Sequence, residues 1–207
     1  MRCRFCCTCL MSLMAVGCAP RETRFEVLSF KSQIRLGGSP IQPDHYSERF
    51  PNGSFAVNAH RDFTFTFELE PQARLDEQTT SAPVEDTAQV IRIEVFWKAR
   101  PGTTYAESSQ TNANLSYCLI SGRHAITYEG AGFVYFTRSF DGKTISGKIE
   151  SGTLVPVHFS GEPNDLFGPC HLRGTFVARE DRRKVAAAQH KLERNKGRAA
   201  LQAAAPP

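Results

Sequence analysis

The sequence predicts an all-β protein, an antiparallel β-sandwich of about nine strands with a short C-terminal helix; a closed β-barrel is the second choice. Apolar and polar residues alternate along many short segments, as they do in strands with one buried face. Turn dipeptides that contain glycine separate several of these segments, and no helical spacing of apolar residues interrupts them before residue 180. These three observations place residues 25–179 in one β domain.

The N-terminal half of this domain contains four predicted strands. Residues 62–69 form the clearest one, because Phe63, Phe65 and Phe67 alternate with polar residues. Residues 89–98 alternate in the same way but carry apolar residues on both faces, which favours a strand near the centre of a sheet. The two shorter runs are residues 25–30 and 54–57.

Three long segments between the predicted strands are expected to be loops. They are residues 37–53, 71–88 and 100–114. The first holds three prolines, the second is polar and acidic, and the third is rich in Ser, Thr and Asn. Loops carry binding residues more often than strands do, but loops of this length are equally often spacers. The sequence leaves both roles open.

The C-terminal half of the domain predicts a meander of short strands. Asp141-Gly142 and Ser151-Gly152 each lie between β-rich runs and have the composition of tight hairpin turns. Three consecutive antiparallel strands are therefore expected around these two turns. The predicted strands are residues 115–120, 132–138, 144–150, 154–159 and 171–178, with 126–128 as a weaker candidate.

Residues 180–207 form a basic tail in which the strand pattern ends. Val185, Ala188 and Leu192 recur at helical spacing, so we expect one short helix that ends before Gly197. The Ala-rich stretch after it, which ends in two prolines, is expected to be disordered.

The first 17 residues resemble a secretory signal peptide. Arg2 and Arg4 precede an uncharged run from Cys6 to Val16, and small residues follow. The run is too short to span a bilayer, which needs roughly 20 apolar residues in a helix. We therefore expect residues 1–17 to be removed during export.

The end of this leader, Ala15-Val16-Gly17-Cys18, resembles the lipobox of bacterial lipoproteins. The resemblance implies that Cys18 becomes the first residue of the mature chain and carries diacylglycerol and palmitate. Residues 18–24 are then a lipidated tether to the β domain. Ala19 follows the cysteine, so the aspartate that holds some lipoproteins at the inner membrane is absent. The resemblance thus implies the cell envelope, at the outer membrane if the host has two membranes. A plain signal peptide cleaved nearby is the alternative.

Five of the seven cysteines lie in the leader or at its end. Cys3, Cys6 and Cys9 have C-x-x-C spacing, but a zinc or redox site is not expected in a segment that is removed. Cys118 and Cys170 are the pair that stays in the folded domain, and an oxidising compartment favours a disulfide between them. Two separate buried thiols are the alternative.

The charge of the chain excludes nucleic acid as an expected partner. The formal net charge is +4, and loss of the leader lowers it to about +2. Residues 179–198 hold eight Lys or Arg against three Asp or Glu. We expect the 180–198 tail either to contact anionic lipid or a cell-wall polymer, or simply to be a solvated helix.

No catalytic, cofactor-binding or metal-binding residue is expected. His158 and His171 lie on adjacent predicted strands near Asp165, but a metal site needs further ligands aimed at one point, so structural histidines are the better interpretation. Glu68 and Glu94 could form a pair of acids for glycoside hydrolysis, yet such residues usually lie on the wet face of a sheet. The nucleophile motif G-x-S-x-G does not occur.

These observations favour a lipid-anchored protein of the cell envelope with a non-enzymatic binding or structural β domain and no cofactor. One alternative is a small envelope hydrolase that acts on polysaccharide or peptidoglycan, which requires at least two acids in a concave pocket. The other is a lipocalin-like carrier of a lipid, which requires an internal cavity.

Overall fold

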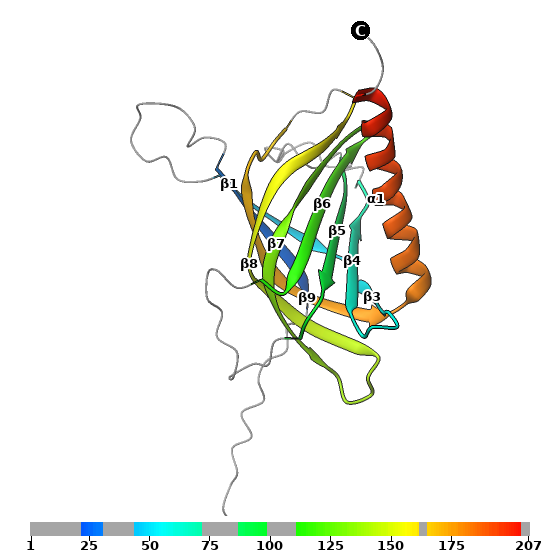
Figure 1. Ribbon diagram of the computed structural model, residues 1–207. Coiled ribbons are helices and arrows are strands. Elements are labelled where there is room, and N and C mark those ends of the chain that lie inside the picture. The colour runs from blue at the N-terminus through cyan, green and yellow to red at the C-terminus, as the bar shows by residue number, and fades with distance from the viewer. Residues whose placement is uncertain (1–21, 31–43, 72–86, 99–110, 162–164, 204–207) are drawn as a thin grey trace, which may run out of the picture.

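The computed structural model describes residues 22–30, 44–71, 87–98, 111–161 and 165–203 (Figure 1). These residues form nine strands and one helix, so the predicted all-β class with a C-terminal helix is confirmed. The elements are β1 (Thr23–Ser29), β2 (Asp44–Phe50), β3 (Gly53–Val57), β4 (Phe63–Leu69), β5 (Ala88–Val95), β6 (Ala113–Ser121), β7 (His124–Arg138), β8 (Thr144–Ser160), β9 (Cys170–Glu180) and α1 (Arg182–Ala203).

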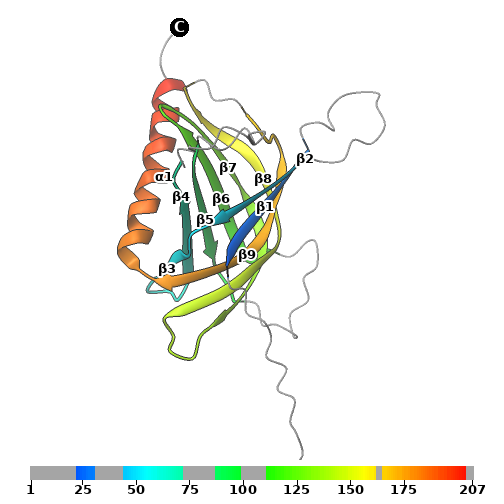
Figure 2. The ribbon, with the colours of Figure 1, turned by 180° about the vertical axis from the view of Figure 1, so that it is seen from behind.

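All nine strands belong to one sheet, in the order β2-β1-β9-β3-β4-β5-β6-β7-β8. β9 also pairs with β8, so the strands from β9 round to β8 close into a ring. The pairs are antiparallel except for β3 with β9, which are parallel, a detail that the sequence did not indicate. β1 pairs with the first half of β9, and Figure 2 shows β1 and β2 lying across one side of the ring.

The core lies inside this ring and is dominated by aromatic side chains. Phe65 and Phe67 of β4 are fully buried, as their alternation predicts. The ring of Phe65 lies 5.1 Å from that of Phe176 and 5.4 Å from that of Phe136, measured between centroids. Phe residues from β3, β4, β7 and β9 therefore form one continuous aromatic cluster.

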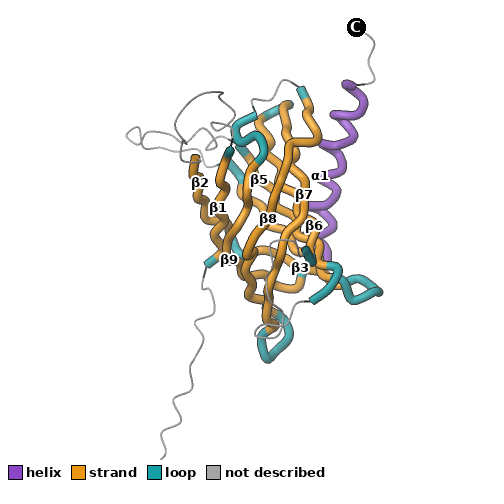
Figure 3. Tube along the Cα trace, turned by 60° about the vertical axis from the view of Figure 1, so that its left-hand side comes forward, coloured by secondary structure: helices purple, strands orange, loops and turns teal. Residues whose placement is uncertain are grey.

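The helix α1 begins at a side-chain cap and packs on the outer face of the sheet (Figure 3). The carboxylate of Asp181 accepts hydrogen bonds from the backbone N–H groups of Arg183 and Lys184, which would otherwise lack a partner at the start of a helix. The predicted apolar stripe is confirmed, since Val185, Ala188 and Leu192 are buried.

The helix is longer than expected. It continues through Gly197 to Ala203, although a helical glycine costs roughly 1 kcal/mol. Lys191 forms ion pairs with Glu68 and Glu70, and Lys196 forms one with Glu129, so two charges of the basic tail bind carboxylates of the sheet. None of the described helices is both long and apolar enough to cross a membrane.

β7 and β8 each join two of the predicted strands into one. The expected hairpin at Ser151-Gly152 is wrong, because β8 continues through these residues with an irregularity between Ile149 and Thr153. Gly152 serves close packing here: a Cβ atom on it would lie 2.3 Å from a methyl carbon of Leu115. The glycine was therefore correctly seen as special but was assigned the wrong role.

β2 lies within residues 37–53, which were expected to be a loop. Within the sheet it pairs with β1 alone and so forms one edge. Pro43 and Pro51 flank the strand, as is usual for prolines near sheet edges. The prolines and the polar residues that an edge strand presents to solvent hid this strand from the sequence analysis.

The predicted turn at Asp141-Gly142 is confirmed, and it allows a first test. Gly142 has a φ angle of 70°, in the left-handed region, and its N–H donates to the carbonyl of Ser139 at 3.0 Å. Gly142→Ala should lower the free energy of unfolding by about 1 kcal/mol, because alanine is strained at this φ. Gly197→Ala, in the helix and with open space around it, should instead raise that free energy. Urea unfolding measures both; equal effects would contradict the assignment.

Candidate functional site

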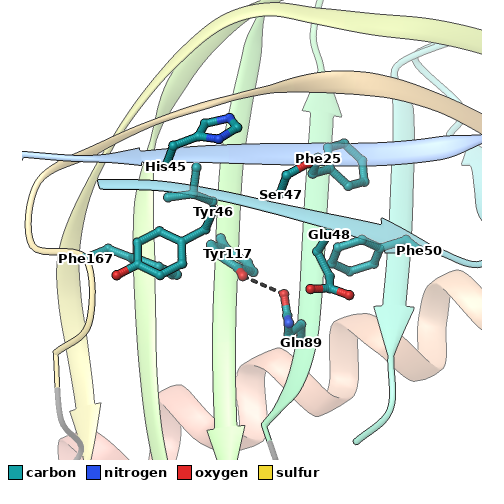
Figure 4. A pocket seen from close by; sticks show the side chains of 10 residues that line it. Phe25, His45, Tyr46, Ser47, Glu48, Phe50, Gln89, Tyr117 and Phe167 are labelled. Atoms are coloured by element: carbon teal, nitrogen blue, oxygen red, sulfur yellow. Dashed lines mark hydrogen bonds between the residues drawn. The ribbon is translucent and has the colours of Figure 1, made fainter. Parts of the chain in front are cut away.

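A cavity of about 260 Å³ lies between the β1–β2 pair and strands β5 and β6 (Figure 4). The two strands that cross the ring form one wall, and the inner face of the ring forms the other. The segment that leads into β9 contributes Phe167. The described lining residues are Phe25, Val27, His45, Tyr46, Ser47, Glu48, Phe50, Gln89, Tyr117 and Phe167.

The walls of the cavity are mainly aromatic and pack against one another. The rings of Phe25 and Phe50 lie 5.2 Å apart, edge to face. The ring of Phe167 lies 4.8 Å from that of Tyr46 and stacks on that of Tyr117 at 5.9 Å. Such edge and stacked contacts fix the orientation of the rings. The apolar part of the site is therefore preformed.

Polar groups also line the cavity. The hydroxyl of Tyr117 donates a 2.6 Å hydrogen bond to Oε1 of Gln89, and both side chains are buried. Burial raises the pKa of Tyr117, and the nearby Cys170 and Glu48 raise it further. The phenol therefore stays neutral and keeps its proton. Figure 4 shows the carboxylate of Glu48 pointing toward Gln89 from β2.

Phe167 is held in place by a hydrogen-bond network behind it. The carboxylate of Asp165 accepts hydrogen bonds from the hydroxyl of Tyr128 at 2.6 Å and from the N–H groups of Phe167 and Gly168. The hydroxyl of Ser29 donates to the carbonyl of Phe167 at 2.7 Å. Burial and the Asp165 charge raise the pKa of Tyr128, so this hydrogen bond persists at neutral pH.

His171, one of the two histidines considered as metal ligands, has other partners. Nδ1 of His171 lies 3.2 Å from the hydroxyl oxygen of Thr153, and its ring packs against Phe30. The carboxylate of Asp165 accepts the hydrogen bond of Tyr128 described above. In the described part of the chain, no three His, Cys, Asp or Glu residues are grouped as a metal site would require.

The two acids considered for hydrolysis lie on the outer face of the sheet, away from the cavity. Glu68 forms an ion pair with Lys191 of α1, and Glu94 forms one with Arg92. Both carboxylates thus take part in surface ion pairs. Of the described residues that line the cavity, Glu48 is the one carboxylate.

The disulfide expected between Cys118 and Cys170 is not formed. Both cysteines are free and buried. Cys118 belongs to the small cluster beneath α1, with Val90 and Ala125, whereas Cys170 belongs to the core inside the ring. The two side chains therefore lie on different faces of the sheet, and the alternative of two separate thiols is the one that the structure supports.

Both thiols should be unreactive while the protein is folded. Burial raises the pKa of Cys170 to about 12 and also raises that of Cys118, and the thiolate is the reactive form. At pH 8, iodoacetamide should label neither residue in the native protein and both after unfolding in urea without reductant. Mass spectrometry counts the labels. Two residues that stay unlabelled after unfolding would show a disulfide and contradict the structure.

Sequence reasoning missed most of this site. Tyr46, Glu48 and Phe50 lie in the segment that was expected to be a loop, although their spacing of two residues is a strand signal. Gln89 and Tyr117 were placed on predicted strands but were not singled out. Cys18, the leader and the leader cysteines lie outside the described residues.

Comparisons of the chain with protein-family models, with curated proteins and with solved structures found no match.

Proposed function

We propose that this chain is a lipid-anchored protein of the cell envelope whose β domain binds a small molecule in the cavity between β2 and strands β5 and β6. The cavity is the observation that carries the binding role. The resemblance of residues 15–18 to a lipobox supports the anchor, with Cys18 as the acylated residue. Binding without catalysis fits a site that combines aromatic walls with few polar groups.

The ligand should be small and have two chemically different parts. A volume of about 260 Å³ lies below the roughly 300–1,000 Å³ typical of sites for drug-sized molecules. An apolar or aromatic body would pack against Phe25, Phe50 and Phe167. A cationic or hydrogen-bonding head would lie near Glu48 and Gln89, where a carboxylate and aromatic faces both favour positive charge.

The other functions considered from the sequence have less support. A hydrolase that uses paired acids needs two carboxylates at the site. Among the described residues that line the cavity, Glu48 is the one acidic residue. A lipid carrier fits the presence of a cavity but not its size, which is small for a whole lipid. Binding of anionic lipid or cell-wall polymer by the 180–198 tail is a secondary proposal, since Lys191 and Lys196 already form ion pairs.

Calorimetric titration with phenethylammonium, a small aromatic cation, tests the binding role. We expect binding to the full chain that is weakened several-fold by Glu48→Gln. Glu94→Gln is the matched control, because Glu94 lies on the outer face of the sheet, away from the cavity, and pairs with Arg92. Absence of binding for both phenethylammonium and neutral 3-phenylpropanol would contradict the proposed site; equal binding by the wild type and Glu48→Gln would contradict the assigned head position.

A further inference from the structure

Three exposed aromatic side chains lie toward the same end of the ring. Phe140 is fully exposed at the tip of the β7–β8 hairpin, which projects beyond the other strands (Figures 1 and 2). Phe96 and Trp97 follow the end of β5 and are 48% and 39% exposed. We name Phe96, Trp97 and Phe140 the aromatic end. Exposed aromatic side chains on the same side of a protein can together contact a membrane surface.

Trp97 lies beside the base of the same hairpin. Its ring lies 5.8 Å from that of Phe133 in β7, and its Nε1–H donates to the carbonyl of Thr111 at 3.2 Å. The ammonium group of Lys98 lies 5.2 Å from the centre of the Phe136 ring. Trp97 thus has a satisfied polar group and a partly exposed ring, next to an exposed cation. This combination is typical of residues at a membrane–water interface.

The chain also enters the β domain at this end. The hydroxyl oxygen of Thr23, the first residue of β1, accepts from the N–H of Val177 at 3.0 Å, and the N–H of Glu180 donates to the carbonyl of Lys143 beside the hairpin turn. The start of β1 and the projecting hairpin are therefore both tied to the C-terminal part of β9. Figure 1 shows both at the same end of the ring.

The length of chain between Thr23 and Cys18 limits the distance to the membrane. The two positions are five steps apart in the sequence, and an extended chain spans at most about 3.3–3.6 Å per residue. The acylated sulfur therefore lies within roughly 20 Å of the start of β1. A lipid on Cys18 thus keeps this end of the domain, and not the opposite one, beside the bilayer.

We propose that the aromatic end docks on the bilayer that holds the Cys18 lipid and inserts Phe140 and Trp97 into the interfacial layer. The proposal rests on the lipid anchor of the proposed function. Burial of the exposed rings in the interface, together with the positive charges of Lys98 and Lys143, gives the domain a second attachment and a fixed orientation. A single orientation would set the direction in which the cavity faces.

Trp97 is the single tryptophan of the chain, so its fluorescence reports on this end without a label. The protein as purified from the expressing cells is reconstituted in phosphatidylcholine vesicles with one-fifth phosphatidylglycerol, with or without bromine on the acyl chains, and flotation tests attachment. We expect bromine to quench Trp97 and the vesicles to shift its emission to the blue. Phe140→Ser should reduce the quenching. Phe159→Ser, which changes a 44% exposed ring near the other end of β8, should not.

The vesicle experiment distinguishes failure of the docking proposal from failure of the lipid anchor. Protein that floats with the vesicles but shows no quenching of Trp97 would overturn docking of the aromatic end and leave the anchor intact. Protein that does not float would overturn the anchor and, with it, the docking that depends on it. Quenching that Phe140→Ser and Phe159→Ser reduce equally would show an unoriented domain and would also overturn the proposal.

Discussion

Cys18→Ser is expected to move the protein from the membrane fraction to the soluble fraction. If the lipobox resemblance is correct, the thiol of Cys18 is the group that carries the lipid, and serine cannot form the thioether. Stable anchoring takes more than one acyl chain, so loss of the modification should leave at most weak, reversible contact through the aromatic end. Fractionation of cells followed by a high-salt wash of the membranes measures the change.

The leader itself provides a matched control. Cys9→Ser makes the same chemical change in the apolar run, which is expected to be removed, so the protein should stay in the membrane fraction. A Cys18→Ser protein that has lost its leader, as its mass shows, and still stays membrane-bound after the wash would show that lipid on this residue is not the anchor. Release of both variants would point to a defect in export.

Phe65→Ala is expected to cost about 3–5 kcal/mol of unfolding free energy, the usual range for a buried phenylalanine. The side chain is completely buried and contacts the rings of Phe55, Phe63, Phe136 and Phe176, which come from four different strands. Removal of the phenyl group therefore leaves a cavity inside the ring of strands, where side chains from these strands meet. The loss is a large part of the roughly 5–15 kcal/mol that stabilises a typical domain.

Phe140→Ala is the matched control for stability, because the ring of Phe140 is fully exposed. It should change the free energy of unfolding by less than about 0.5 kcal/mol. Urea denaturation of both variants, at equal slopes with denaturant, gives the comparison. A decrease of less than about 1 kcal/mol in the free energy of unfolding of Phe65→Ala would contradict the aromatic core, because removal of a buried phenyl group costs more than that.

Local patterns in the sequence predicted the strands and the helix that have one buried face and one outer face. Phe63, Phe65 and Phe67 alternate because β4 has an inner and an outer face, and Val185 and Leu192 recur because α1 lies on the sheet. In both cases the residues that define burial are close in the sequence. Periodicity alone then indicates the element and its buried face.

Features that depend on pairing between distant segments could not be predicted. Gly152 has the composition of a turn but lies in a continuous strand against Leu115, which comes from another part of the chain. Cys118 and Cys170 were compatible with a disulfide until the sheet placed them on different faces. Neither the closure of the ring through β8 and β9 nor the parallel β3–β9 pair has a local signature.

The cavity also depends on segments that are distant in the sequence. Its walls come from β1, β2, β5, β6 and the segment before β9, and they meet because β1 and β2 cross the ring. Glu48 and Phe50 lie on an edge strand flanked by prolines, and Phe167 is positioned by Asp165 and Tyr128. No spacing in the sequence brings these residues together.

The most direct test of the central claim, that this cavity is a ligand site, is to map where a ligand binds. We predict that phenethylammonium, added to the full chain, shifts the aromatic NMR signals of Phe25, Phe50, Tyr117 and Phe167 and leaves those of Phe65 and Phe140 unchanged. Shifts confined to rings outside the cavity, or spread evenly over the surface, would contradict the account.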